Sequence, residues 1–102
     1  MPGWVKMATL DELMEGQAKE VEHDGRVYAI FNIGGRISAV DGICPHQGGP
    51  LADGPISGNC VTCPWHGWQF DVTTGATSIN KKLKLPVFEV QIQGNDILVA
   101  VP

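Results

Sequence analysis

Two short stretches of the chain combine cysteine and histidine at close spacing. Cys44 and His46 lie in CPHQGGPL, and Cys63 and His66 lie in CPWHGWQFD. A gap of sixteen residues separates Cys-x-His from Cys-x-x-His, and each stretch has proline directly after its cysteine and glycine close behind its histidine. Thiolate and imidazole are ligands that transition metals such as zinc and iron favour. The two stretches together predict a metal site far more strongly than either does alone.

Three interpretations of these four side chains stay open at this point. They can be core residues with satisfied polar atoms, ligands of one structural zinc ion, or ligands of two metals. Zinc binds two cysteines and two histidines tetrahedrally, but its sites favour Cys-x(2–4)-Cys and His-x(3–5)-His pairs. Here each stretch supplies one ligand of each kind, which suits a two-metal cluster with both sulfurs on one metal and both nitrogens on the other. A zinc-stapled interaction module is the alternative of another class.

The elements that must position this site are predicted to be β-strands. From Val27 the pattern has period two, with Val27, Ala29, Phe31 and Ile33 on one face. Gly34-Gly35 then turns the chain into RISAV, which indicates a hairpin. Near the C-terminus, Phe88, Val90 and Ile92 alternate with polar residues, so we expect one face of this strand to be buried and the other to be wet.

The ends of the chain add two further elements to this prediction. A turn at Gly94-Asn95 leads into a last strand, DILVAV, and closes a second hairpin. Thr9 and Glu12 resemble a capping box, which predicts one short helical turn through Leu13 and Met14 that ends by Gly16.

The middle of the chain, from about residue 41 to 74, shows little apolar alternation. Glycine, proline, cysteine, histidine and tryptophan collect there instead. Such a segment is not expected to hold together by core burial alone, and a bound metal would staple it.

Length and composition restrict the classes of function. A chain of 102 residues fits one domain, and 43% apolar with 18% charged residues suits a compact globule. A net charge of −4 disfavours nucleic acid or an anionic membrane as the partner. No apolar run is long enough to span a bilayer, the start lacks an export signal, and three cysteines fit reduced thiols better than a disulfide framework. We therefore expect a cytoplasmic protein and a monomer.

CPHQGGPL followed by CPWHGWQFD resembles the two cluster-binding loops of the Rieske 2Fe-2S ferredoxin family, in which two histidines replace two cysteines on one iron. The resemblance extends over nearly the whole chain, through TTGATS to the final hairpin. It implies an all-β, Rieske-type domain over residues 1–102: an antiparallel β-sandwich base with a small inserted cluster-binding subdomain at about residues 42–72. It also implies one 2Fe-2S cluster, with Cys44 and Cys63 on the inner iron and His46 and His66 on the outer iron.

The surroundings of the motifs bear on the reduction potential that the resemblance implies. High-potential Rieske proteins of respiratory complexes link the two loops by a disulfide, and the matching positions here are Gly49 and Trp65. Those proteins also place a serine and a tyrosine where this chain has Trp68 and Phe70. Fewer hydrogen bonds to sulfur leave the reduced cluster less stabilised, so we expect a potential near the low end of the Rieske range, about −150 mV.

Four other features receive weaker predictions. Cys60 should be a buried, inert thiol that points away from Cys63, because side chains alternate along a strand. An apolar cover over the cluster is expected from Pro50, Leu51, Pro64, Trp65 and Pro86. The lysines of NKKLKLP, residues 80–86, form a positive cluster that either is a solvated face or orients a partner. His23 is interpreted as an exposed turn residue without a role.

The function implied by the resemblance is one-electron transfer. The chain would carry single electrons from a flavin-dependent NAD(P)H reductase to the terminal oxygenase of a ring-hydroxylating dioxygenase system. The small Rieske subunit of an assimilatory NAD(P)H nitrite reductase, partnered by the large subunit of that enzyme, has similar loops and stays open as the alternative. No nucleotide fingerprint or nucleophile triad occurs in the sequence, so we expect a carrier and not an enzyme.

Overall fold

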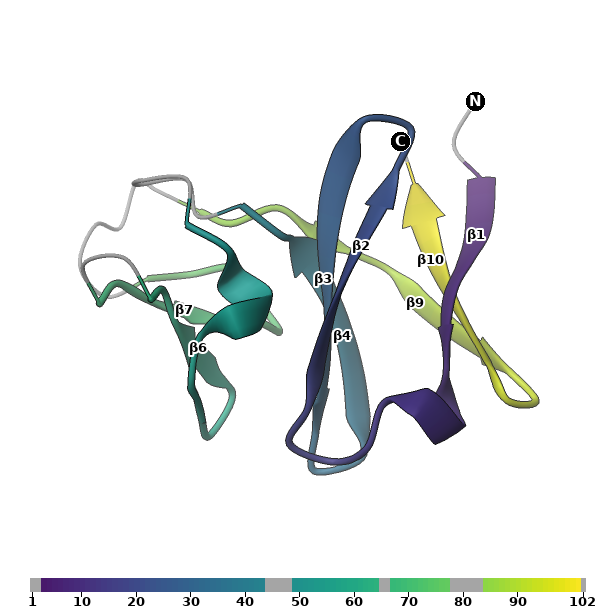
Figure 1. The fold of residues 1–102 in the computed structure, drawn as a ribbon, viewed down its shortest axis with the longest axis horizontal. Coiled ribbons are helices and arrows are strands. Elements are labelled where there is room, and N and C mark those ends of the chain that lie inside the picture. Colours follow the sequence, from purple (N-terminus) through teal and green to yellow (C-terminus); the bar gives the residue numbers. More distant parts are fainter. Residues whose placement is uncertain (1–2, 44–48, 65–66, 78–83, 102) are drawn as a thin grey trace.

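The computed structural model describes residues 3–43, 49–64, 67–77 and 84–101. They form antiparallel strands with two short 3₁₀ turns (Figure 1). The strands are β1 (Gly3–Thr9), β2 (Ala18–His23), β3 (Arg26–Ile33), β4 (Arg36–Asp41), β5 (Ile56–Ser57), β6 (Cys60–Thr62), β7 (Gln69–Asp71), β8 (Val87–Phe88), β9 (Val90–Gln93) and β10 (Asp96–Val101). The turns are η1 (Leu10–Glu12) and η2 (Leu51–Asp53).

Three sheets stack as layers. The strand orders are β1-β10-β9, β2-β3-β4-β8 and β5-β6-β7, and each pair is antiparallel. The first two sheets, built from both ends of the chain, form the base, and the third sheet lies beside them (Figure 1). We call the segment between β4 and β8, residues 42–86, the inserted unit. The predicted all-β fold, a sandwich base with a small insertion, is confirmed.

The middle sheet is buried on both faces. Tyr28 and Ile30 of β3 pack with side chains of β1 and β10 in one core, whereas Ala29 and Phe31 pack with side chains of the inserted unit in a second core. The period-two pattern places Ala29 and Phe31 on one face, and Tyr28 and Ile30 on the opposite face are buried as well. A central layer loses both of its faces to neighbours, so alternation in hydrophobicity gives way to a continuous apolar run.

The first predicted hairpin is confirmed, with Gly34-Gly35 between β3 and β4. Both glycines have positive φ, 62° and 86°, as the tightest hairpin turns require. The second hairpin is confirmed from Val90 onward, but Phe88, predicted on the same strand, belongs to β8 in the middle sheet. The burial predicted for this hairpin was wrong at Ile92, which remains 43% exposed on the edge strand β9. His23 also differs from the prediction. It is the half-buried last residue of β2, and the turn that follows is Asp24-Gly25.

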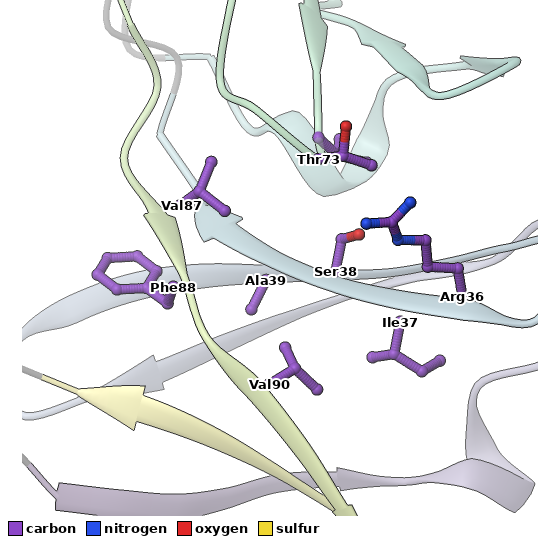
Figure 2. Close-up of a pocket in the computed structure, with 9 residues that line it drawn as sticks. Arg36, Ile37, Ser38, Ala39, Thr73, Val87, Phe88 and Val90 are labelled. Carbon is purple, nitrogen blue, oxygen red and sulfur yellow. The ribbon is translucent and has the colours of Figure 1, made fainter.

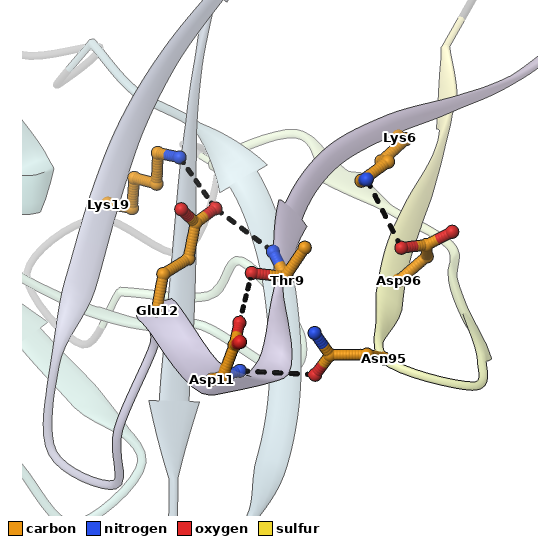
Figure 3. A network of polar contacts seen from close by, with 7 residues as sticks. All are labelled: Lys6, Thr9, Asp11, Glu12, Lys19, Asn95 and Asp96. Atoms are coloured by element: carbon orange, nitrogen blue, oxygen red, sulfur yellow. Dashed lines mark hydrogen bonds and ion pairs between the residues drawn. The ribbon is translucent and has the colours of Figure 1, made fainter.

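The predicted turn near the N-terminus is a 3₁₀ turn that ends at Glu12, before Leu13 and Met14. Glu12 accepts the backbone N–H of Thr9 at 3.0 Å, as a capping box requires, and also pairs with Lys19 at 2.8 Å. The hydroxyl of Thr9 donates instead to the carboxylate of Asp11 (Figure 3). These contacts tie β1, η1 and β2 together at one corner of the base.

A neighbouring part of the same corner joins the two ends of the chain. The backbone N–H of Asp11 donates to Asn95 Oδ1 at 3.2 Å, and Lys6 pairs with Asp96 at 3.3 Å (Figure 3).

Among the described residues, no helix has the length and apolar character that crossing a bilayer requires.

Candidate metal centre

Of the four predicted metal ligands, Cys63 lies within the described residues. Cys44, His46 and His66 lie outside them. Cys63 directly follows β6 and is only 1% exposed, packed in the second core with Val61 and Phe70. The side chain of Cys63 is therefore shielded from water.

The loop that carries Cys63 and His66 is closed at its base by two backbone hydrogen bonds. Cys63 N–H donates to the carbonyl of Trp68 at 2.7 Å, and Gly67 N–H donates to the carbonyl of Cys63 at 3.2 Å. Gly67 adopts a φ of 75°, a left-handed conformation that other residues rarely take. The chain therefore reverses within the motif itself.

The loop that carries Cys44 and His46 is closed in a similar way. Ile43 and Pro50 form an antiparallel bridge, and Leu51 N–H donates to the carbonyl of Gly42 at 3.0 Å. Gly42 N–H in turn donates to the carbonyl of Val27 at 2.9 Å, which anchors this neck to β3. The neck of the first loop is thus attached directly to the middle sheet of the base.

The inserted unit brings the two necks together. Leu51, at the end of the first loop, and Cys63, at the start of the second, belong to the same core. Gly54 lies so close to the second neck that a Cβ built on it would be 1.9 Å from the carbonyl oxygen of Thr62. Thr62 N–H donates to the carbonyl of Pro55 at 2.9 Å. The two motifs, separated in sequence, therefore start from adjacent points.

This arrangement fits a cluster that takes one sulfur and one nitrogen from each loop. The sequence places two cysteines and two histidines in these two loops, and the described thiol, that of Cys63, is buried as the sulfur side of such a cluster requires. Within the described part of the chain, no disulfide links Cys60 to Cys63. No three metal-binding side chains gather elsewhere in the part of the chain that the structure describes.

The side chains at the tuning positions carry no hydroxyl group. Phe70 is fully buried, and Trp68 is half-buried with its ring centroid 6.5 Å from that of Phe70. Gly49 is buried at the first loop and has no thiol to offer, and its predicted counterpart Trp65 lies outside the described residues. At the described positions, Gly49, Trp68 and Phe70 therefore have no hydroxyl group that could donate a hydrogen bond and stabilise added negative charge.

Cys60 lies on the opposite face of β6 from the core. Val61 and Cys63 enter the second core, while Cys60 and Thr62 alternate with them and are half-buried. The predicted divergence of Cys60 from Cys63 agrees with this pattern. The prediction that Cys60 is buried was wrong, because its face of β6 is not covered by the base.

The apolar cover differs from its prediction. Leu51 is fully buried and belongs to the core, whereas Pro50 is half-buried and Pro64 and Pro86 are exposed. Trp65 lies outside the described residues, as do residues 80–83 of the lysine-rich segment. Lys84 is exposed and forms a β-bridge with Ala76.

A shallow pocket lies at the seam between the inserted unit and the base. Arg36, Ser38 and Thr73 line one side of it, and Val87 and Val90 line the other (Figure 2). Beside this seam, the hydroxyl and backbone N–H of Thr73 donate to the carboxylate of Asp71 and hold the pKa of that carboxyl below its usual value. The charge of Arg36 lowers the pKa of Asp71 further. A charged turn thus connects the two regions.

Three glycines that position the loops were not found from the sequence. Besides Gly54, a Cβ on Gly75 would lie 2.0 Å from the carbonyl oxygen of Leu85, and a Cβ on Gly42 would lie 2.6 Å from a methyl group of Val27. These are close approaches between segments distant in sequence. The sequence shows only that glycine is frequent in the chain. It does not show which glycines lie against another segment of the backbone.

The family model of the Rieske [2Fe-2S] domain matches residues 3–89. The chain belongs to the Rieske [2Fe-2S] domain family. Its cofactor is accordingly a 2Fe-2S cluster, and the zinc interpretation falls away.

Curated relatives fall into two groups that differ in length. Over 88 residues the Rieske domain is 40% identical to cholesterol 7-desaturase nvd 1 of Ciona intestinalis, a match that covers 84% of this chain but 19% of the relative. Over 98 residues it is 32% identical to the ferredoxin component of naphthalene 1,2-dioxygenase/salicylate 5-hydroxylase systems from a Ralstonia species, covering 93% and 92%. The chain thus spans about a fifth of the desaturase and nearly all of the ferredoxin.

Several solved structures match over nearly their whole length. The ferredoxin of carbazole 1,9a-dioxygenase from Nocardioides aromaticivorans is 30% identical, with a TM-score of 0.89 and coverage of 97% of this chain and 98% of that one. A complex of reduced oxygenase and oxidized ferredoxin in carbazole 1,9a-dioxygenase matches at 29% identity, with a TM-score of 0.88 and coverage of 95% and 92%. A putative nitrite reductase small subunit from Mycobacterium tuberculosis, 22% identical, has a TM-score of 0.90 over 100% of this chain and 97% of that chain and shares the fold.

Proposed function

We propose that this Rieske domain carries single electrons from an NAD(P)H-dependent flavin reductase to the terminal oxygenase of a ring-hydroxylating dioxygenase system. The observation that carries the proposal is the length of the match. The chain covers 92% of the Ralstonia ferredoxin component and 98% of the Nocardioides ferredoxin. The desaturase match covers a small part of an enzyme, and the nitrite reductase likeness is one of fold.

In this proposal Cys44 and Cys63 bind the inner iron of the cluster, and His46 and His66 bind the outer iron. When bound, the cluster accepts and returns one electron, at a higher potential than an all-cysteine cluster because two histidines replace two thiolates. The chain holds the ligands through the two closed necks. Leu51, Val61 and Phe70, all fully buried, exclude water from the side of Cys63.

The partner proposed for this carrier is a terminal oxygenase. One similar ferredoxin has been solved in complex with its oxygenase, which supports docking of this kind. A net charge of −4 gives little attraction for nucleic acid or anionic membranes. We place the protein in the cytoplasm as a monomer that meets its partners transiently.

Reconstitution with candidate partners tests this function. The purified red-brown protein is mixed with a flavin reductase, NADH or NADPH, and either a ring-hydroxylating oxygenase or a sirohaem nitrite reductase large subunit. We expect electron transfer that depends on the chain in the oxygenase mixture. Turnover only with the nitrite reductase subunit would replace the proposed partner, and a colourless protein that binds zinc would reject the proposed function.

A further inference from the structure

Arg26 and Asp41 form an ion pair at the point where the base meets the first cluster loop. Arg26 Nη2 lies 3.4 Å from Asp41 Oδ2, and the two side chains are 40% and 24% exposed. Arg26 begins β3 and Asp41 ends β4. The inserted unit starts with the next residue.

Asp41 also contacts the neck of the first loop directly. Its Oδ1 accepts the backbone N–H of Ile43 at 3.0 Å, and its own backbone N–H donates to the carbonyl of Pro86 at 2.9 Å. One residue therefore connects the start of the inserted unit, its end and the base. A carboxylate that accepts a backbone N–H fixes the direction in which the chain leaves the strand.

Arg26 is itself held by aromatic rings. Its guanidinium lies 5.0 Å from the ring centroid of Phe88 and 6.0 Å from that of Tyr28, and these two rings meet edge to face. Its Nε is buried and has no hydrogen-bond partner among the described residues. The cation–π contacts and the pair with Asp41 thus fix where this positive charge lies.

The charge pair lies within electrostatic reach of the cluster site. Asp41 precedes Cys44 by three residues, which an extended chain spans in at most about 11 Å. This length is close to the Debye length of about 8–10 Å at moderate ionic strength, and partly buried charges are screened less than exposed ones. A negative charge near the site disfavours the added electron, and a positive charge favours it.

We propose that Asp41 is a positioning residue for the first cluster loop, and that Arg26 offsets its charge so that the carboxylate orients the loop without lowering the reduction potential. Without Arg26, the carboxylate that orients Ile43 would stand uncompensated beside the site. This inference rests on the proposed function, because it requires a bound redox cluster. It gives the rings of Tyr28 and Phe88 the role of holding the compensating charge of Arg26 in place.

The test compares reduction potentials of the cluster-loaded protein. Arg26→Gln should lower the potential, Asp41→Asn should raise it, and the double variant should return close to the parent. Arg26→Lys, which keeps the charge, should stay closer to the parent than Arg26→Gln. All shifts should shrink as salt concentration rises. Shifts of the same sign in the two single variants, or no shift in either, would overturn the electrostatic role.

The ion pair Lys6–Asp96 supplies a matched control. Its nitrogen and oxygen are 3.3 Å apart, its side chains are 54% and 45% exposed, and it joins β1 to β10 in the outer sheet of the base. Lys6→Gln and Asp96→Asn should leave the potential unchanged. Shifts as large as those at Arg26 and Asp41 would show a general effect of net charge and reject the proposal.

The positioning role of Asp41 has a separate readout. Hydrogen exchange read by mass spectrometry should show faster exchange of the Ile43 amide in Asp41→Ala but not in Asp41→Asn, because the asparagine side chain retains an oxygen acceptor. Equal exchange in the two variants would reject the positioning role. Iron and colour are measured first, so failure to bind a cluster counts against the proposed function, while exchange at Ile43 still tests the positioning.

Discussion

The base and the inserted unit are held together by different kinds of contact. In the base, β1 pairs with β10 at six positions and β2 pairs with β3 along its full length. In the inserted unit, β6 and β7 have three residues each and β5 has two. Isolated backbone hydrogen bonds connect its segments. Val72 N–H donates to the carbonyl of Asn59 at 2.9 Å, and Leu85 N–H donates to the carbonyl of Gly75 at 2.8 Å.

The inserted unit shares its hydrophobic core with the middle sheet of the base. Leu51, Val61 and Phe70 are fully buried, and they pack against Ala29 and Phe31 of the middle sheet. The base, by contrast, closes a core of its own between its two sheets. Burial of apolar side chains stabilises both regions, but the inserted unit also depends on the base and on close backbone contacts. Although the segment shows little apolar alternation, several of its side chains are fully buried against the base. The prediction that it needs a bound metal to hold together stays a prediction.

The largest expected effect comes from the thiol that faces this shared core. Cys63→Ala should remove a cluster ligand and abolish bound iron and visible absorption. Cys60→Ala is the matched control on the other face of β6, and it should retain both. Iron analysis and the visible spectrum of the purified variants measure the difference. Loss of iron from both variants would contradict the separation of the two thiols.

A close backbone contact gives the next largest effect. Gly54 has a φ of −79°, which any residue can adopt, so Gly54→Ala tests space alone. Its new Cβ would meet the Thr62 carbonyl, and we expect the free energy of unfolding to fall by about 1–3 kcal/mol. Gly3→Ala in β1, with no atom within 4 Å of the added Cβ, should be nearly neutral. Thermal and denaturant unfolding compare the two, and equal stabilities would argue against tight packing at this neck.

The same contrast explains how much could be predicted from the sequence. In the base, turn glycines and apolar alternation are local signals, and they located the hairpins at Gly34-Gly35 and Gly94-Asn95. Burial was harder to predict, because whether Ile92 is covered depends on how far the facing sheet extends. Alternation on β3 did not reveal that both of its faces are buried, because that depends on the layers packed on either side of it.

In the inserted unit, the chemistry was predictable and its support was not. The paired spacing of cysteine and histidine identified the family, and the family match agrees. The contact of Gly54 with Thr62 and that of Asp41 with Ile43 depend on how separate segments meet in space. The periodicity of apolar residues in the sequence does not predict such contacts. The roles of Cys44, His46, Cys63 and His66 as ligands stay predictions.

A smaller effect is expected at the apolar tuning positions of the inserted unit. Phe70→Tyr adds a hydroxyl beside the buried Cys63, where a donor to sulfur would stabilise the reduced cluster. We expect a parent potential of about −150 mV and a higher value in the variant. Protein-film voltammetry measures both. Phe31→Tyr, on the base side of the same core, tests whether any added hydroxyl has this effect, and an equal rise there would contradict a specific bond to sulfur.

The smallest effect concerns two similar aspartate–threonine pairs, one in each region. The hydroxyls of Thr73 and Thr9 lower the pKa values of Asp71 and Asp11 in the folded protein. A lowered folded pKa means that each carboxylate stabilises the fold above its unfolded pKa of about 3.9, and that this contribution is lost as pH falls through the folded value. Asp71→Asn should therefore flatten the fall of Tm in acid.

The position of each aspartate should decide what else changes. Asp71 ends β7 at the seam, where its backbone N–H donates to the carbonyl of Ala76 at 2.9 Å, so its protonation should also speed cluster loss below pH 4. Asp11 lies in the exposed turn η1 of the base, so Asp11→Asn should alter Tm slightly and leave cluster retention unchanged. Visible absorption and circular dichroism, followed together from pH 6 to pH 3, separate the two readouts. Identical profiles for both variants would show that the seam does not transmit acid destabilisation to the cluster site.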